Sequence, residues 1–167
     1  MVLIGVGSNR GDTVATVIEA MRRLAAFASG PVRRSSLWRT SPVDCPPGSP
    51  DFINAAAAFE PRPGLTPEAL LRGLKTLEAE YGREIQPVRN APRELDLDLL
   101  VFGTETRDEP DFVLPHPRAV NRLFVLAPAE EVAPGLIWPG TGRTVAQLRR
   151  DLNSSERIDR LSLAEQS

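Results

Sequence analysis

The chain has 167 residues, a formal net charge of −2 and a hydrophobic content of 41%, values that are typical of an ordinary globular protein. This charge argues against a general nucleic-acid binder and against a membrane-surface binder. No apolar run is long enough to cross a bilayer, and the apolar residues 2–6 lack the basic flank of a signal peptide. Cys45 is the single cysteine, which fits a reducing, cytoplasmic setting.

Apolar periodicity and capping residues predict the elements of the first part of the chain. Residues 2–6 form a buried strand, and Asp12 caps the following helix, which ends before Gly30. A continuous strand is expected over residues 32–39, with its even-numbered side chains on one face. The proline-rich segment 40–51 is a loop, and it is either functional or a surface connection that proline stiffens.

The middle of the chain contains a strand, a helix and a basic segment. Residues 52–59 are rich in alanine and predict a strand that can pack closely under a helix. Thr66 and Pro67 begin the helix, and Gly82 ends it. The segment 83–93 carries three arginines and one acidic residue. It is either a solvated basic loop or a loop that grips phosphate.

The stretch 92–102, Pro-Arg-Glu-Leu-Asp-Leu-Asp-Leu-Leu-Val-Phe, is the most informative one. Its alternation predicts a strand with Asp96 and Asp98 on one face and leucines on the other. Residues two apart on a strand are separated by about 6.5–7 Å, so both carboxylates can reach one or two hard cations such as Mg²⁺. Arg93 adds a planar fork suited to phosphate. An exposed strand face that happens to carry two acids is the plainer interpretation.

The order strand-helix-strand-strand-helix-strand is typical of a ferredoxin-like α+β sandwich, with a mostly antiparallel sheet and flanking helices. We expect one catalytic domain over residues 1–152, with the C-terminal elements added to this sandwich. Those later elements are a polar turn (residues 103–111), an extended segment (113–117) and a helix interrupted near Pro128 (118–131). They are followed by an edge strand (136–138), a helix capped by Thr144 (144–152) and a flexible tail (153–167).

Three motifs now stand in one order along the chain: residues 5–9 (Gly-Val-Gly-Ser-Asn), residues 92–100, and residues 114–124, which begin Leu-Pro-His-Pro-Arg and end Asn-Arg-Leu-Phe. Through them the chain closely resembles the 6-hydroxymethyl-7,8-dihydropterin pyrophosphokinase family over residues 2–152. The resemblance implies that ATP donates its β,γ-diphosphate to the hydroxymethyl oxygen of the reduced pterin. The products are AMP and the pterin diphosphate, in folate biosynthesis. We expect a cytoplasmic monomer that has no nucleic-acid or membrane partner.

The resemblance also implies roles for individual residues. Asp96 and Asp98 would hold two Mg²⁺ ions that bridge the ATP phosphates, and Arg83 and Arg93 would act in a catalytic loop. The residues that would bind ATP are Glu78, Arg93, Leu99, His116 and Arg122. The residues that would bind the pterin are Thr40, Ser41, Val43, Phe52, Asn54 and Phe124.

Two aromatic faces can hold a flat pterin ring, and an amide such as that of Asn54 offers it both a donor and an acceptor. Plainer interpretations exist, because Phe52 and Phe124 could be ordinary core residues and a lone histidine, His116, is often structural. The segment 84–91 also departs from the usual family pattern. The alternatives to a pyrophosphokinase are a non-catalytic relative and a different metal-dependent transferase or nuclease.

Overall fold

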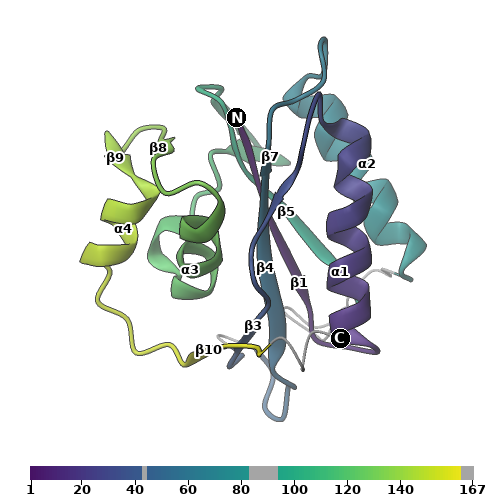
Figure 1. The fold of residues 1–167 in the computed structure, drawn as a ribbon, viewed down its shortest axis with the longest axis vertical. Helices are drawn as coiled ribbons and strands as arrows, with labels where there is room; N and C mark the ends of the chain where they lie inside the picture. Colours follow the sequence, from purple (N-terminus) through teal and green to yellow (C-terminus); the bar gives the residue numbers. More distant parts are fainter. Residues whose placement is uncertain (43–44, 83–93, 163–167) are drawn as a thin grey trace.

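The structure is a computed structural model that describes residues 1–42, 45–82 and 94–162. An antiparallel sheet forms the middle of the fold (Figure 1). Within the described residues its strands lie in the order β10-β3-β4-β1-β5, and β2 also pairs with β4. The bounds are Val2–Ser8 for β1, Arg33–Arg34 for β2, Trp38–Thr40 for β3, Phe52–Phe59 for β4, Asp96–Phe102 for β5 and Ile158–Arg160 for β10. The order of β3, β4, β1 and β5 is that of a ferredoxin-like sandwich, so the predicted fold class is confirmed.

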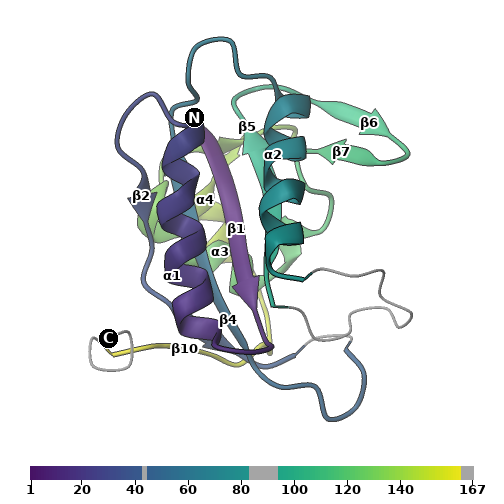
Figure 2. The same cartoon turned by 90° about the vertical axis from the view of Figure 1, so that its right-hand side faces the viewer.

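Helices cover both faces of this sheet (Figures 1 and 2). On one face lie α1 (Thr13–Arg23), extended by a 3₁₀ turn at Leu24–Phe27, and α2 (Pro67–Glu80). On the other face lies α3 (Leu123–Val132), and α4 (Val145–Asp151) packs against it. Among the described helices, none has the length and apolar character needed to cross a membrane.

Side-chain caps begin the helices at the predicted residues. The carboxylate of Asp12 and the hydroxyl of Thr66 each accept a hydrogen bond from a backbone N–H in the first turn, at 3.3 and 3.1 Å. Thr144 and Gln147 form a reciprocal capping box at the start of α4. Gly82 follows α2 with a φ of 72°, a conformation that glycine adopts without strain.

The central strand β1 is enclosed on both faces. Ile4 and Val6 pack into the core under α1 and α2, whereas Leu3 packs into a second core under α3. Because side chains alternate along a strand, Gly5 and Gly7 share the face of Leu3. These two positions present no side chain toward the α3 side of the sheet, which leaves space there.

The prediction of a continuous strand over residues 32–39 is wrong, because this segment forms two separate strands, β2 and β3. Ser35 lies between them, where its N–H donates to the Ala56 carbonyl and its Oγ accepts from the Ala56 N–H, at 2.9 and 2.8 Å. A side-chain oxygen thus replaces a backbone partner and breaks the alternation. Leu37 and Trp38 are buried in succession, which the alternating pattern did not anticipate.

The polar segment 103–111 contains more than a turn. It includes β6 (Arg107–Glu109), which pairs antiparallel with β7 (Phe112–Leu114). β6 has no apolar alternation by which it could be recognised in the sequence, because its side chains are mostly exposed. The hairpin extends away from the main sheet (Figure 2) and leads directly into the predicted extended segment.

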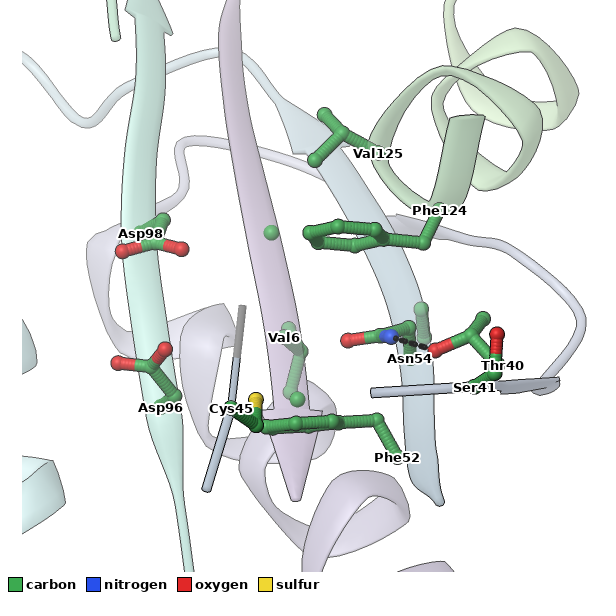
Figure 3. Close-up of a pocket in the computed structure, with 13 residues that line it drawn as sticks. Val6, Thr40, Ser41, Cys45, Phe52, Asn54, Asp96, Asp98, Phe124 and Val125 are labelled. Carbon is green, nitrogen blue, oxygen red and sulfur yellow. Dashed lines mark hydrogen bonds between the residues drawn. The ribbon is translucent and has the colours of Figure 1, made fainter. Parts of the chain in front are cut away.

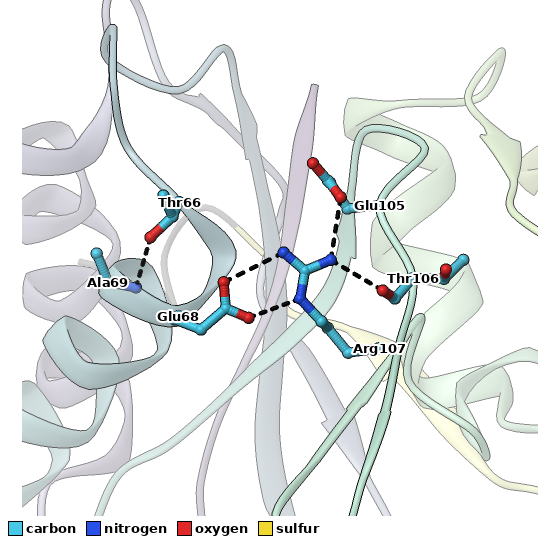
Figure 4. A network of polar contacts seen from close by, with 6 residues as sticks. All are labelled: Thr66, Glu68, Ala69, Glu105, Thr106 and Arg107. Carbon is cyan, nitrogen blue, oxygen red and sulfur yellow. Dashed lines mark hydrogen bonds and ion pairs between the residues drawn. The ribbon is translucent and has the colours of Figure 1, made fainter.

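Arg107 fastens this hairpin to the start of α2 (Figure 4). Its Nε and Nη2 donate to the two carboxylate oxygens of Glu68, at 2.6 and 3.1 Å. Its Nη1 donates to Glu105 Oε2 and to the Thr106 carbonyl, at 3.0 and 2.8 Å. A planar guanidinium suits such a two-pronged contact, so Arg107 joins the start of α2 to the hairpin.

The predicted helix over 118–131 is also different in detail. A 3₁₀ turn at Ala119–Asn121 precedes α3, and Pro128 lies buried inside α3 without ending it. Packing of α3 against β4 therefore outweighs the backbone bond that a proline removes. The predicted edge strand is β8 (Ile137–Trp138), which pairs with β9 (Arg143–Thr144) outside the main sheet.

The prediction of a flexible tail from residue 153 is wrong for the part of that segment that the structure describes, residues 153–162. Ile158–Arg160 form β10, which pairs antiparallel with β3. Leu161 is only 3% exposed and packs into the core under α1 and α2. The sparse apolar residues of this segment are therefore enough to dock it, because each meets a partner far away in sequence. Residues 163–167 lie outside the described residues.

The Arg107–Glu68 pair should make stability depend on pH. Arg107 lowers the pKa of the Glu68 carboxyl below its ordinary 4.5, chiefly through their hydrogen bonds. A carboxyl group whose pKa is lower in the folded state stabilises the fold at pH values above its ordinary pKa. This stabilisation is lost as the pH falls through the folded-state pKa. Thermal unfolding should therefore show a lower midpoint for Arg107→Ala at about pH 7 and a smaller difference from the wild type at about pH 3.

The matched control is Arg150→Ala, whose Nε lies 3.7 Å from Asp151 and whose side chain is 70% exposed. Such an exposed pair contributes little, so the control should leave the midpoint nearly unchanged. A difference between wild type and Arg107→Ala that stays the same at both pH values would contradict the assigned role.

Candidate functional site

A cavity of about 150 Å³ opens on the α3 side of the sheet, between β1, β4, β5 and the start of α3 (Figure 3). Its floor includes Gly5 and Gly7, the two positions of β1 that present no side chain. The structure gathers seven of the residues predicted from the sequence in its walls: Thr40, Ser41, Phe52, Asn54, Asp96, Asp98 and Phe124. Residues from four separate segments of the chain thus meet at one site.

The two aspartates lie on β5 beside these glycines. In the ladder between β1 and β5, Asp98 is opposite Gly5 and Asp96 is opposite Gly7. Both aspartates are partly exposed, and the leucines at positions 95, 97 and 99 are buried on the other face, as the alternation predicted. Figure 3 shows both carboxylates directed to the same side of the strand. The pair offers hard oxygen ligands, of the kind that Mg²⁺ prefers.

Two carboxylates leave most positions around such a cation to other ligands. Among the described residues, no group of three or more histidine, cysteine, aspartate or glutamate side chains is placed to hold a metal ion. Mg²⁺ usually keeps several waters and binds through one or two carboxylates together with substrate phosphates. The donor set therefore fits a Mg²⁺ ion that arrives with a phosphate-bearing substrate.

Two aromatic rings form the opposite half of the cavity. Phe52 begins β4 and Phe124 is the second residue of α3, and their rings lie above and below the amide of Asn54 (Figure 3). Asn54 is 8% exposed, and its Nδ2 donates to Thr40 Oγ1 at 2.8 Å. This bond turns the amide oxygen toward the cavity (Figure 3). A flat ring between the phenylalanines would thus meet a fixed acceptor at its edge.

Gly7 makes the position of Asn54 possible. A Cβ added at Gly7 would lie 2.6 Å from Asn54 Oδ1 and 3.7 Å from Phe52 Cδ1. The first distance is well inside contact range, so any side chain at Gly7 would displace the amide. The strand expected from the sequence covered only residues 2–6, so Gly7 lay outside it, whereas β1 extends to Ser8. The signal that could have identified this residue is a glycine in every second position of a buried strand, which marks a close approach of another group.

His116 follows β7 and a cis bond between Leu114 and Pro115, and its backbone N–H donates to the Leu100 carbonyl at 2.9 Å. Its Nδ1 accepts from the Arg118 N–H at 3.3 Å, which leaves Nε2 as the N–H donor of a neutral ring. Burial lowers the pKa of His116, against the opposing influence of the Asp96 carboxylate. The imidazole is therefore neutral near pH 7 and has one N–H that can donate a hydrogen bond.

The remaining predicted residues fall into three situations. Arg122 lies just before α3, with its Nη1 3.9 Å from Glu156 Oε1. The side chains of Leu99 and Glu78 do not line the cavity, because Leu99 packs into the core under α1 and α2 and Glu78 is fully buried on α2. The other three predicted residues lie outside the described residues: Val43, Arg83 and Arg93.

The chain is similar to several known proteins. A family model described as 7,8-dihydro-6-hydroxymethylpterin-pyrophosphokinase (HPPK) matches residues 3–134. The 2-amino-4-hydroxy-6-hydroxymethyldihydropteridine pyrophosphokinase of Methylorubrum extorquens is 37% identical over 161 residues, which cover 93% of this chain and 97% of that protein. The protein of the same name from Synechocystis sp. is 36% identical over 146 residues, which cover 87% of this chain and 73% of that protein.

A longer relative is also similar to the chain. The folic acid synthesis protein fol1 of Pneumocystis carinii is 30% identical over 145 residues, and the match covers 87% of this chain but 19% of that protein. The chain thus spans about a fifth of the fol1 protein, whereas it spans nearly the whole of the Methylorubrum protein. The chain therefore belongs to the 7,8-dihydro-6-hydroxymethylpterin-pyrophosphokinase family, which confirms the predicted class of enzyme, a pyrophosphokinase of folate biosynthesis.

Proposed function

We propose that this pyrophosphokinase binds 6-hydroxymethyl-7,8-dihydropterin and ATP in the described cavity and joins the β,γ-diphosphate of ATP to the hydroxymethyl oxygen of the pterin. The observation that carries the proposal is the meeting of a phenylalanine pair with a pair of aspartates in one cavity. One half suits a flat heteroaromatic ring. The other half suits a cation that neutralises phosphate charge.

The pterin half positions the acceptor. Phe52 and Phe124 stack on the two faces of the ring, and the amide oxygen of Asn54 accepts from an N–H at its edge. The Thr40 hydroxyl holds that amide in one orientation, at 2.8 Å from Nδ2. Ser41 lines the same wall, and we add Val43 on the strength of the family resemblance. In this position, the hydroxymethyl group of the ring points toward the two aspartates.

The phosphate half uses Asp96 and Asp98, which would hold two Mg²⁺ ions on a rigid strand. When bound, Mg²⁺ neutralises the charge of the phosphates and orients them for in-line attack. The neutral His116 donates through Nε2, and Arg122 supplies positive charge near the start of α3. We include Arg83 and Arg93 as phosphate-binding residues of the catalytic loop, and Glu78 and Leu99 as residues near the nucleotide.

We further propose a monomer that works in the cytoplasm without a nucleic-acid partner. The net charge of −2 and the single cysteine support this view, because neither a basic surface nor a disulfide framework is indicated by such a composition.

The products of the reaction test the proposed function directly. The protein is incubated with ATP, Mg²⁺ and 6-hydroxymethyl-7,8-dihydropterin, and the nucleotides are separated by chromatography. AMP should appear together with the pterin diphosphate in equal amounts, and chelation of the metal with EDTA should stop the reaction. Formation of ADP instead of AMP, or turnover that persists in EDTA, would refute the proposal.

Removing the charge of one aspartate should remove most of the activity. Asp96→Asn and Asp98→Asn should each lower kcat on the order of 10²–10³-fold, because charge stabilisation in such a site is the main contribution to the rate. Initial rates of AMP formation measure the effect. Asp108→Asn, an exposed position in the β6–β7 hairpin, is the matched control and should be as active as the wild type. Full activity of either site variant would exclude these ligands.

Gly7→Ala should weaken pterin binding more than ATP binding. The added methyl group displaces the Asn54 amide, and losing one hydrogen bond of about 1 kcal/mol corresponds to a KM for the pterin that is raised roughly fivefold. The comparison variant is Gly30→Ala, where an added Cβ meets nothing within 4 Å. Steady-state kinetics with each substrate varied in turn measure both KM values. Equal increases in the two KM values would mean that Gly7 serves the fold rather than the pterin.

A further inference from the structure

The start of α3 is capped by a residue from far along the chain. Within the described residues, the N-cap residue Arg122 makes no side-chain capping bond of its own. Instead Glu156 Oε2 accepts from the N–H groups of Leu123 and Phe124, at 2.6 and 3.2 Å. The Glu156 side chain is only 11% exposed. A carboxylate here satisfies two backbone donors and complements the positive end of the helix dipole.

The residue that donates the second of these bonds is Phe124, whose ring forms one wall of the cavity. The backbone of Phe124 is thus tied directly to Glu156, and the position of its ring depends on that backbone. The other carboxylate oxygen of Glu156 lies 3.9 Å from Arg122 Nη1. The side chain of Glu156 therefore contacts both Arg122 and Phe124, two residues that are proposed to bind substrates.

The residues that follow Glu156 fix another wall of the cavity. β10 pairs with β3 so that Ile158 lies opposite Thr40. The Ser41 N–H donates to the Arg157 carbonyl at 3.1 Å, and the Leu161 N–H donates to the Leu37 carbonyl at 2.8 Å. Thr40 and Ser41 both line the cavity, so the edge of the sheet that carries them is ordered by the C-terminal segment.

We propose that residues 156–161 form a C-terminal strap that sets these two walls relative to each other, with Glu156 as the positioning residue for Phe124. The strap begins at Glu156, which caps the start of α3, and continues into β10, which lies beside β3 at the edge of the sheet (Figure 1). It lies outside residues 3–134, which the family model matches. The inference rests on the proposed pterin site and adds a segment that this site requires.

Glu156→Ala tests the strap. Loss of the two capping bonds should raise the KM for the pterin roughly tenfold, the range expected for removal of a helix cap, while kcat at saturating pterin stays within about twofold. Steady-state kinetics give both constants, and quenching of protein fluorescence by the pterin gives its Kd independently. Glu156→Gln should restore the pterin KM to within about twofold of the wild type, because the amide oxygen can still accept both bonds.

Glu130→Ala is the matched control. Glu130 is a carboxylate of moderate exposure, and its Oε1 lies 2.6 Å from Arg149 Nη1, between α3 and α4. It ties down the far end of the same helix and does not line the cavity. This variant should lower the thermal midpoint and leave the pterin KM unchanged. If Glu156→Ala behaves like Glu130→Ala, the strap only stabilises the fold and the inference is overturned.

A further variant keeps the test decisive if Glu156→Ala does not fold. Glu156→Asp withdraws the carboxylate by one methylene and keeps its charge, and it should raise the pterin KM while the protein stays folded. Amide hydrogen exchange at Phe124 should also become faster in Glu156→Asp and return to the wild-type rate in Glu156→Gln. Unchanged exchange and an unchanged KM in Glu156→Asp would overturn the strap.

The proposed function and the strap fail in different ways. Wild-type protein that does not bind the pterin overturns the proposed function, and the strap falls with it. Wild-type protein that binds the pterin, together with a Glu156→Ala variant that binds it equally well, overturns the strap alone. Weaker pterin binding by Glu156→Ala that is rescued by Glu156→Gln supports both.

Discussion

The site depends on the close approach of β4 and β5 side chains to a central strand that has no side chains of its own at Gly5 and Gly7. β1 is buried on both faces, so residues of ordinary size at these positions would fill the space that the cavity occupies. At Gly7 the constraint is sharpest, because a Cβ there would lie 2.6 Å from the Asn54 amide oxygen. The same strand holds Asp96 and Asp98 in register beside it. A backbone constraint thus underlies both the aromatic half and the acidic half of the cavity.

Around this floor, the walls come from segments that are far apart in sequence and are joined by side chains that bind backbone or buried amide groups. Thr40 holds Asn54, and Glu156 holds the N-terminus of α3. Contacts at the other end of α3 complete its docking, since Glu131 accepts from the Trp38 indole N–H at 2.7 Å. A site whose parts are fixed before substrate arrives loses little conformational freedom on binding.

Local patterns in the sequence predicted the local features of the fold. The alternation around Asp96 predicted the strand and its acidic face, and Asp12, Thr66 and Thr144 marked three helix starts. Features that depend on distant partners were missed. Ser35 breaks a strand because it meets Ala56, and Ile158–Arg160 form a strand because β3 offers an edge. Glu156 carried no signal in the sequence, because a cap that closes a helix from thirty-odd residues away has no fixed spacing.

In the proposed complex, one cavity holds a ring between two phenylalanines and a cation at two aspartates. A crystal structure of the protein with Mg²⁺, a non-hydrolysable ATP analogue and 6-hydroxymethyl-7,8-dihydropterin tests it most directly. We expect the pterin ring between Phe52 and Phe124, its edge at Asn54, and metal ions bound by Asp96 and Asp98. A pterin bound elsewhere, or metal ions that contact neither aspartate, would contradict it.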